Sequence, residues 1–210
     1  VATTLKWIVK QEKLMMKKKI AGIDYSLTSP AICVYEKEDD DRYFDFDGCM
    51  LYYLSNSEKQ KQLAAGCGLS NLQAEPYPEW ETEEERHDAL SSWAISIVKG
   101  CSEVFIEGYA FATSAQAGVR SIAENTGLLK HKMWKQKIKF STYPPTVIKK
   151  FATGKGNANK ELMYDAFTSE LVTPTDLKER LTPKAKAIKN PISDIVDAYY
   201  IAKCGAEEVL

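Results

Sequence analysis

Short segments of alternating or continuous hydrophobic residues fill the first quarter of the chain, which is typical of β-strands. The segment KKKIAGIDYS, residues 17–26, predicts a strand, and AICVYE, residues 31–36, predicts another after a turn at 27–30. A polar hairpin tip, EKEDDDR, follows, and residues 43–55 are again rich in β-forming residues. Two glycines and two prolines between residues 55 and 80 predict that this stretch is irregular.

The remaining chain alternates helical and strand patterns. Thr82 and Glu85 match a capping box that opens a helix ending at Gly100. We predict strands at 103–109 and 138–145, and helices at 114–137, 146–154, 160–170 and 190–208. Residues 172–190 predict a basic connector, and Asn190 the cap of the last helix. This order of elements predicts an α/β fold, with a mixed sheet covered by helices.

Composition limits the class of protein. A chain of 210 residues, 44% of them hydrophobic, is sufficient for one domain, to which we assign residues 17–210. Residues 1–16 hold only a short apolar patch and predict an N-terminal extension rather than a signal peptide. No apolar run reaches the ~20 residues of a membrane span. Five scattered cysteines without a CxxC pair predict reduced thiols in a cytoplasmic protein.

The net charge of −1 hides an uneven distribution of charge. Nine lysines and no acidic residue lie from Lys130 to Lys160, whereas acids dominate residues 36–47 and 75–88. A run of like charge is often only a solvated face. This run includes a Gly-containing loop, and it predicts a surface that faces phosphate groups.

Four acidic residues occupy positions from which their side chains can converge. Asp24 ends the first strand, Glu107 ends the strand VFIE, and Asp194 and Asp197 share one face of the last helix. Each has an ordinary structural explanation, because strand-end aspartates form turns and acids favour the first turns of helices. Together they would repel unless cations neutralised them, and Mg²⁺ prefers such oxygen ligands. Two such ions about 3.5–4 Å apart promote phosphodiester hydrolysis.

Four segments, in this order, resemble the RuvC-type Holliday-junction resolvases of the RNase H-like nucleases. GIDYSLTS resembles the strand with the first metal-binding aspartate, which falls on Asp24, and VFIEGYAF resembles the strand with the catalytic glutamate, which falls on Glu107. VIKKFATGKGNANKELM resembles the family's Thr-Gly-x-Gly-x-Ala-x-Lys stretch. SDIVDAYYIA resembles its terminal Asp-x-x-Asp-Ala helix. The resemblance spans residues 18–203 and points to a phage or virus-like member.

The resemblance implies an RNase H-like fold with a five-stranded mixed sheet. It implies a crossover junction endodeoxyribonuclease, a homodimer that places paired, symmetric nicks in four-way DNA junctions. The four acids would hold two Mg²⁺ ions, or Mn²⁺ in their place, and water would attack the phosphodiester. We expect the dimer contact on helix 114–135 and a cytoplasmic location in a bacterium or an infected host. The residues expected to bind DNA are Lys149, Lys150, Lys155, Lys160, Gly154, Gly156, Tyr109 and Phe111.

The chain departs from the family pattern at three places. Tyr25-Ser26 follows the first aspartate where the family often has Pro-Gly. Ala110 occupies the position of an expected aromatic wedge, with Tyr109 and Phe111 on either side. The acid-rich segment 36–88 is unlike a surface that binds DNA, and we expect it to lie away from the junction.

Three other functions are compatible with parts of the pattern. A nuclease with broader substrate specificity, acting on flaps or forks, would share all four acids. A catalytically silent DNA-binding relative is disfavoured because all four acids are present. Sugar-kinase or actin-like ATPases share the Gly-Ile-Asp strand, but 210 residues cannot hold the two copies of the core that they need. His87 and His131 are expected on the surface, without partners for a nucleophilic triad.

Overall fold

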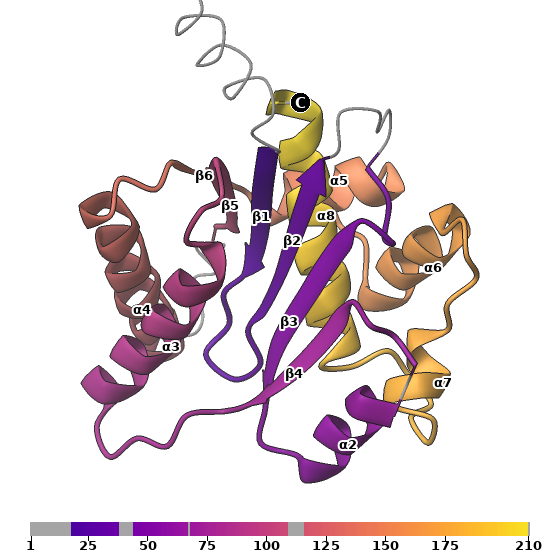
Figure 1. The fold of residues 1–210 in the computed structure, drawn as a ribbon, viewed down its shortest axis with the longest axis horizontal. Helices are drawn as coiled ribbons and strands as arrows, with labels where there is room; N and C mark the ends of the chain where they lie inside the picture. The colour runs from indigo at the N-terminus through magenta and orange to yellow at the C-terminus, as the bar shows by residue number, and fades with distance from the viewer. Residues whose placement is uncertain (1–17, 38–43, 67, 109–115, 210) are drawn as a thin grey trace, which may run out of the picture.

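The structure, a computed structural model, describes residues 18–37, 44–66, 68–108 and 116–209. The predicted extension 1–16, most of the hairpin tip, and Tyr109 and Phe111 lie outside the described residues. The strands are β1 (Lys18–Asp24), β2 (Ala31–Lys37), β3 (Cys49–Ser55), β4 (Leu72–Pro76), β5 (Glu103–Glu107) and β6 (Phe140–Tyr143) (Figure 1). The helices are α2 (Glu58–Gly66), α3 (Glu83–Val98), α4 (Gln116–Lys135), α5 (Pro145–Thr153), α6 (Lys160–Glu170), α7 (Leu177–Leu181) and α8 (Ile192–Val209).

The strands form one mixed sheet in the order β4-β3-β2-β1-β5-β6. Only β2 runs against its neighbours, since its pairings with β1 and β3 are antiparallel and all other pairings are parallel. The carboxyl ends of the other five strands therefore lie at one edge of the sheet, which we call the carboxyl edge. In α/β sheets this is the edge at which ligands gather.

The α/β architecture is confirmed, but the count of five strands and the irregular stretch at 55–80 are wrong. This stretch contains α2 and β4, and β4 is the sixth strand. In β4 only Leu72 is buried, so the apolar alternation of a strand is absent from its sequence. Backbone pairing with β3, from Leu51 opposite Leu72 onward, holds β4 in place instead. The predicted connector 172–190 likewise contains a short helix, α7.

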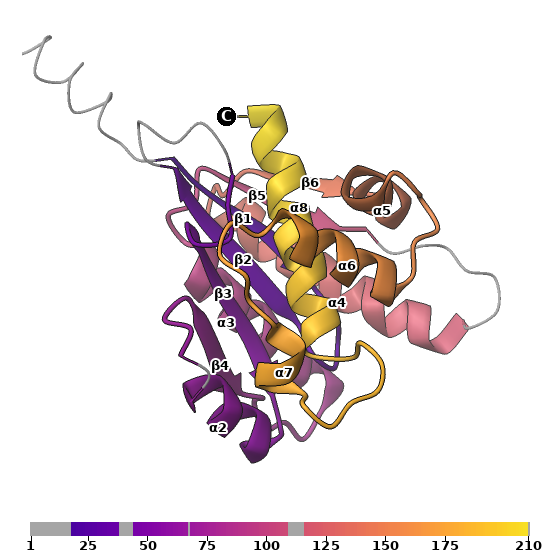
Figure 2. The same ribbon diagram turned by 90° about the vertical axis from the view of Figure 1, so that its right-hand side faces the viewer.

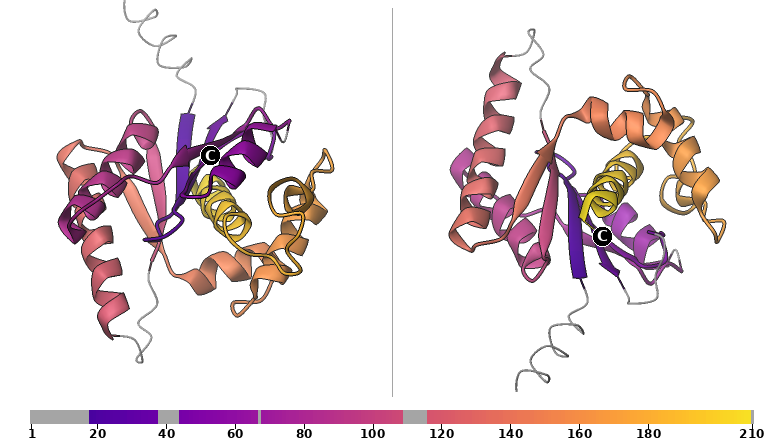
Figure 3. Two further views of the ribbon diagram at one scale, coloured as in Figure 1. Left: turned by 90° about the horizontal axis from the view of Figure 1, so that it is seen from below. Right: turned by 90° about the horizontal axis from the view of Figure 1, so that it is seen from above.

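Helices cover both faces of the sheet (Figures 1 and 2). Helices α3 and α4 lie on one face, and α8 lies across the other, with α5, α6 and α7 packed around it. Viewed along the strands, the sheet separates the two groups of helices (Figure 3). Alternate residues of β1 serve the two cores: Ile20 belongs to the cluster under α8, and Ala21 and Ile23 belong to the cluster under α3 and α4. No helix in the described ranges is long and apolar enough to span a membrane.

Helix α8 packs very closely against β1 and β5 because glycines remove the side chains between them. A Cβ at Gly22 of β1 would lie 2.2 Å from the backbone nitrogen of Ala202 and 2.5 Å from the carbonyl oxygen of Ala198. A Cβ at Gly205 of α8 would lie 2.1 Å from the ring of Phe105 in β5. Only glycine fits at these two contacts, so they fix how close α8 comes to the sheet.

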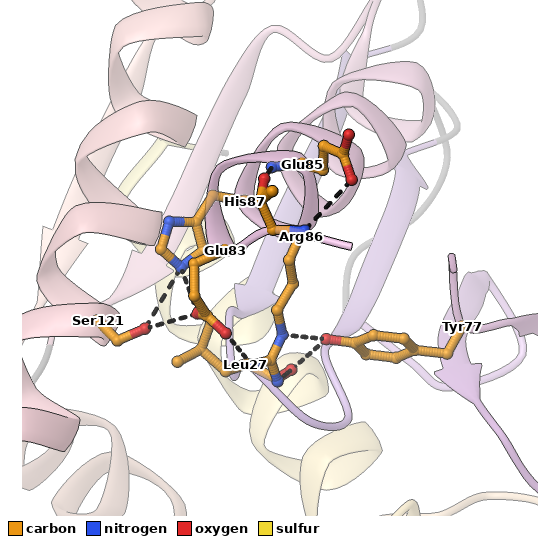
Figure 4. Close-up of polar contacts among 8 residues, drawn as sticks. Leu27, Tyr77, Glu83, Glu85, Arg86, His87 and Ser121 are labelled. Carbon is orange, nitrogen blue, oxygen red and sulfur yellow. Dashed lines mark hydrogen bonds and ion pairs between the residues drawn. The ribbon is translucent and has the colours of Figure 1, made fainter. Parts of the chain in front are cut away.

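A polar cluster ties the start of α3 to the β1–β2 turn (Figure 4). The predicted capping box is confirmed, because Thr82 and Glu85 exchange hydrogen bonds between side chain and backbone. Arg86 Nη2 donates to the carbonyl oxygen of Leu27 at 2.7 Å, and Arg86 Nε donates to the hydroxyl of Tyr77 at 3.0 Å. One guanidinium therefore holds the turn that follows Asp24.

The two histidines differ in environment. His131 is exposed as expected, but the prediction that His87 lies on the surface is wrong, since it is 7% exposed. Its Nε2 lies 3.3 Å from the hydroxyl of Ser121 on α4 and 3.6 Å from Glu83. The Ser121 hydroxyl and the Glu83 carboxylate both lie near the same ring nitrogen of His87. These three side chains therefore link α3 to α4 and do not form a nucleophilic triad.

Candidate active site

The topology brings Asp24 and Glu107 side by side. Strands β1 and β5 are parallel neighbours, and their last registered pair is Ile23 opposite Ile106. The next residue of each strand is one of the two acids. Side chains alternate between the faces of a sheet, so both carboxylates point to the α8 face, as Gly22 and Phe105 do two residues earlier.

Helix α8 supplies the other two acids from its first turns. Gly22 packs against Ala198 and Ala202, which follow these turns, and this contact places α8 over β1. Asp194 is buried and Asp197 is partly exposed. The charges of both raise the pKa of Asp24, as neighbouring carboxylates do.

A network of hydrogen bonds orients Asp194. The hydroxyl of Ser29, in the β1–β2 turn, donates to Asp194 Oδ2 at 2.6 Å, and the side-chain amide of Asn190 donates to Ser29. The hydroxyl of Ser193 donates to Asn190 Oδ1 at 2.9 Å. Lys160 Nζ lies 3.1 Å from both Asn190 Oδ1 and the Ser193 hydroxyl. The turn after β1, the start of α6 and the start of α8 are thereby joined around one carboxylate.

Burial raises the pKa of all four acids, and repulsion by neighbouring carboxylates raises it further for Asp24, Glu107 and Asp197. The pKa of Asp24 is raised well above its usual value, first by burial and then by the charges of Asp194, Asp197 and Glu107. Burial and the charge of Asp197 raise the pKa of Glu107 to about 7. Burial raises the pKa of Asp194 to about 6, against the hydrogen bond from Ser29. Burial and Asp194 raise the pKa of Asp197 to about 6. The cluster is therefore short of positive charge.

Two of the predicted DNA-binding lysines border these acids. Lys149 of α5 lowers the pKa of Glu107 and Asp197, and Lys160 of α6 lowers the pKa of Asp24, Asp194 and Asp197. Both lysines line a cavity of about 300 Å³ that Asp197 also borders. An anionic group in this cavity would contact two ammonium groups beside the carboxylate cluster.

The donor set fits Mg²⁺ in its chemistry. It contains carboxylate oxygens alone, which Mg²⁺ prefers, and its unbalanced negative charge is what a divalent cation would neutralise. No group of three or more His, Cys, Asp or Glu side chains in the described residues is already arranged to hold a metal ion. Forming a metal site would therefore require some of the four acid side chains to rotate towards a common point.

The other residues predicted to bind DNA are less closely placed. Gly154 ends α5 in a left-handed conformation, φ 75°, as a glycine at a helix end commonly does. A Cβ at Gly156 would lie 3.2 Å from the carbonyl oxygen of Thr146. Lys150 and Lys155 are exposed near this loop. Their contribution to DNA binding stays a prediction, as does that of Tyr109 and Phe111, which lie outside the described residues.

Sequence reasoning missed Ser29, and it assigned Asn190 only a capping role. A Ser in a turn and an Asn before a helix are common, and their partners lie more than 160 positions away. The one available signal was their position next to predicted acids, since Ser29 follows Asp24 by five residues and Asn190 precedes Asp194 by four.

Part of the acid-rich segment lies at the carboxyl edge, and its expected position away from the junction stays a prediction. The first turn of α3 carries Glu83, Glu84 and Glu85, and Arg86 in the same turn contacts Leu27 beside the end of β1. Lysines from α5 and α6 border the opposite side of the site. The carboxyl edge therefore carries negative charge towards α3 and positive charge towards α5 and α6.

No protein-family model matches this chain, and no curated protein sequence is detectably similar to it. Solved structures are similar in fold. T. thermophilus RuvC in complex with a Holliday junction substrate matches with a TM-score of 0.57 and 15% identity, over 90% of this chain and 93% of that chain. A second Thermus thermophilus RuvC structure matches with a TM-score of 0.51 and 14% identity, over 90% and 96%.

A Fowlpox virus resolvase in complex with its substrate Holliday junction DNA matches with a TM-score of 0.49 and 14% identity, over 91% of this chain and 99% of that chain. The two RuvC matches extend over nearly the whole of both chains. The sequence-based resemblance is thus confirmed at the level of fold: the chain has the RNase H-like fold of the RuvC-type Holliday-junction resolvases.

Proposed function

We propose that the protein is a metal-dependent endonuclease that resolves four-way DNA junctions by paired, symmetric nicks. One observation carries the proposal: acids from β1, β5 and α8 converge at the carboxyl edge, next to two lysines. Acids that raise one another's pKa lower the stability of the fold, so their convergence calls for a functional explanation. The fold supports the same conclusion, because a similar RuvC structure contains a Holliday junction substrate.

Each residue has a role in this proposal. Asp24, Glu107, Asp194 and Asp197 hold two Mg²⁺ ions, for which Mn²⁺ can substitute. The bound ions would neutralise phosphate charge and provide a nucleophilic water. Ser29 fixes one oxygen of Asp194 and so limits the directions in which that carboxylate can bind. Lys149 and Lys160 attract the phosphates on either side of the scissile bond.

Symmetric nicking requires two active sites, and we propose a homodimer formed through α4. In support, Trp134 of α4 is 70% exposed and its ring lies 5.9 Å from that of His131. Aromatic residues such as tryptophan are enriched in protein interfaces relative to the rest of the surface. Light scattering on the wild type should give a mass of about twice 23.6 kDa. Trp134→Glu should shift that mass towards the monomer.

The proposal is tested by nicking of an end-labelled synthetic four-way junction in Mg²⁺ or Mn²⁺. Linear duplex, a flap and a fork serve as comparison substrates. Asp24→Asn should abolish nicking, while Asp165→Asn, an exposed aspartate on α6, should leave it intact. Equal cutting of flap and fork would replace the resolvase with a general branched-DNA nuclease. Binding without cutting in either metal would contradict catalysis and leave a DNA-binding relative.

A further inference from the structure

A second cavity at the carboxyl edge lies away from the acids. It has a volume of about 200 Å³ and is formed by the start of α2 and the segment that follows α7. Leu63 and Leu181 form part of its wall, and the polar residues that line it are Ser57, Lys59, Thr182, Lys184 and Lys189. Three of these five carry an ammonium group.

The cavity wall contains a hydroxyl group that lacks a partner. Thr182 is 8% exposed, and its Oγ1 forms no hydrogen bond. The backbone of Thr182 is already satisfied, since its N–H donates to the carbonyl of Lys178 and its carbonyl accepts from Ala185. A buried hydroxyl without a hydrogen bond destabilises the fold, so a partner that supplies one is favoured.

The positive charge of the cavity is not neutralised by the protein. No carboxylate in the described residues forms an ion pair with Lys59, Lys184 or Lys189, although the neighbouring Lys61 is paired with Glu58. Three ammonium groups and a hydroxyl around a small space suit an anion with several oxygen atoms. A phosphate group matches this set in size, charge and number of acceptors.

The cavity is linked to the active site through shared residues. Ser57 borders it and also borders a neighbouring cavity of about 260 Å³, which Ser29 and Asn190 line. Ser29 and Asn190 are members of the hydrogen-bond network that holds Asp194. Helix α2 follows the carboxyl end of β3, so all three hollows lie at the same edge (Figures 1 and 2).

We propose that this second cavity, which we call the lysine pocket, binds a backbone phosphate of the DNA strand that leaves the active site along α2 and α7. The inference rests on the proposed function, because it assumes that DNA occupies the carboxyl edge. The acids of α3 direct the strand to this side, since they would repel phosphates on the other. Helix α2, absent from the predicted elements, thus contributes to the length of DNA that the protein contacts.

Binding to a labelled four-way junction without divalent metal tests the lysine pocket. The substitutions Lys184→Gln and Lys189→Gln together should weaken binding several-fold and lower the slope of log affinity against log salt by about 0.9 for each lost phosphate contact. Lys99→Gln, a matched change of an exposed lysine where α3 ends, should alter neither quantity.

Thr182→Val separates loss of binding from loss of folding. Valine keeps the shape and removes a hydroxyl that has no partner, so it should unfold at the same or a higher temperature while binding the junction more weakly. In parallel, a titration with inorganic phosphate, followed by NMR, should shift the amide signals of Thr182 and Ala185 in the wild type and not in the Lys184/Lys189 double variant.

Two results would overturn the lysine pocket, and a third concerns only the proposed function. If the Lys184/Lys189 double variant has the same junction affinity and the same salt slope as Lys99→Gln, no strand phosphate occupies the lysine pocket. If the double variant loses the NMR shifts that phosphate induces but binds the junction as tightly as the wild type does, the lysine pocket is a site for free phosphate instead. If the wild type binds junctions more tightly than the variants do, but nicks them in neither metal, the result would support the lysine pocket and contradict the proposed nuclease.

Discussion

Replacing Glu107 with glutamine should stabilise the metal-free protein, and the gain should grow with pH. Burial and the charge of Asp197 raise the pKa of Glu107 from 4.5 to about 7. The folded protein therefore keeps a proton on Glu107 over a range of pH in which the unfolded chain has released it. When the folded-state pKa is the higher one, stability is lost as pH rises from the unfolded-state value to the folded-state value.

The magnitude follows from these two pKa values. Each pKa unit corresponds to about 1.36 kcal/mol, so ionised Glu107 lowers the free energy of unfolding by about 3 kcal/mol at pH 8. At pH 5 the same relation gives only about 1 kcal/mol. Glutamine has nearly the same shape and no charge, so it removes this cost. In a domain of this size, about 3 kcal/mol corresponds to a rise in Tm of roughly 6–12 °C.

The assay is thermal and urea unfolding in EDTA at pH 5 and pH 8. Glu103→Gln is the control, because Glu103 lies at the opposite end of the same strand from the cluster of acids. Adding Mg²⁺ at pH 8 should raise the Tm of the wild type more than that of Glu107→Gln, since a cation relieves the same repulsion. A gain that is absent at pH 8, or as large at pH 5, would refute the view that Glu107 belongs to a crowded cluster of acids.

Three further changes test the packing around the site. Gly22→Ala should lower Tm severely or unfold the protein, because its Cβ would lie 2.2 Å from a backbone nitrogen of α8; Gly66→Ala, with open space around it, should cost little in the same melt. Ser29→Ala removes the 2.6 Å hydrogen bond to Asp194 and should lower the free energy of unfolding by about 1–3 kcal/mol at pH 8, which an unchanged urea midpoint would contradict. Arg86→Ala should speed amide hydrogen exchange in the β1–β2 turn, and unaltered exchange there would show that this guanidinium does not hold the turn.

The four acids of the candidate site could be predicted because the residues next to each of them in the sequence mark its position. Asp24 and Glu107 each close an apolar run, and a parallel pair of strands brings such residues together whatever else the fold contains. Asp194 and Asp197 were identified by helical spacing next to a family motif. The capping box at Thr82 was equally local, and the structure confirms it.

The features that escaped prediction depend on distant contacts. Strand β4 is held by pairing with β3 rather than by its own side chains, so its sequence carries no apolar alternation. His87 follows a run of glutamates and was expected in solvent, yet α4 covers it. The Ser29–Asp194 bond joins residues 165 positions apart, and no local pattern reports such a contact.

The position of α8 in the chain has a consequence for synthesis. Two of the four acids, and the surface that covers Gly22, belong to this helix, which follows every other described element. A ribosome therefore releases β1 and β5 long before Asp194 and Asp197 emerge, and until then the face of the sheet that α8 covers is left open. Helix α8 then completes the core and the carboxylate cluster in the same step. A nascent chain would thus carry an incomplete cluster of acids until α8 packs onto the sheet.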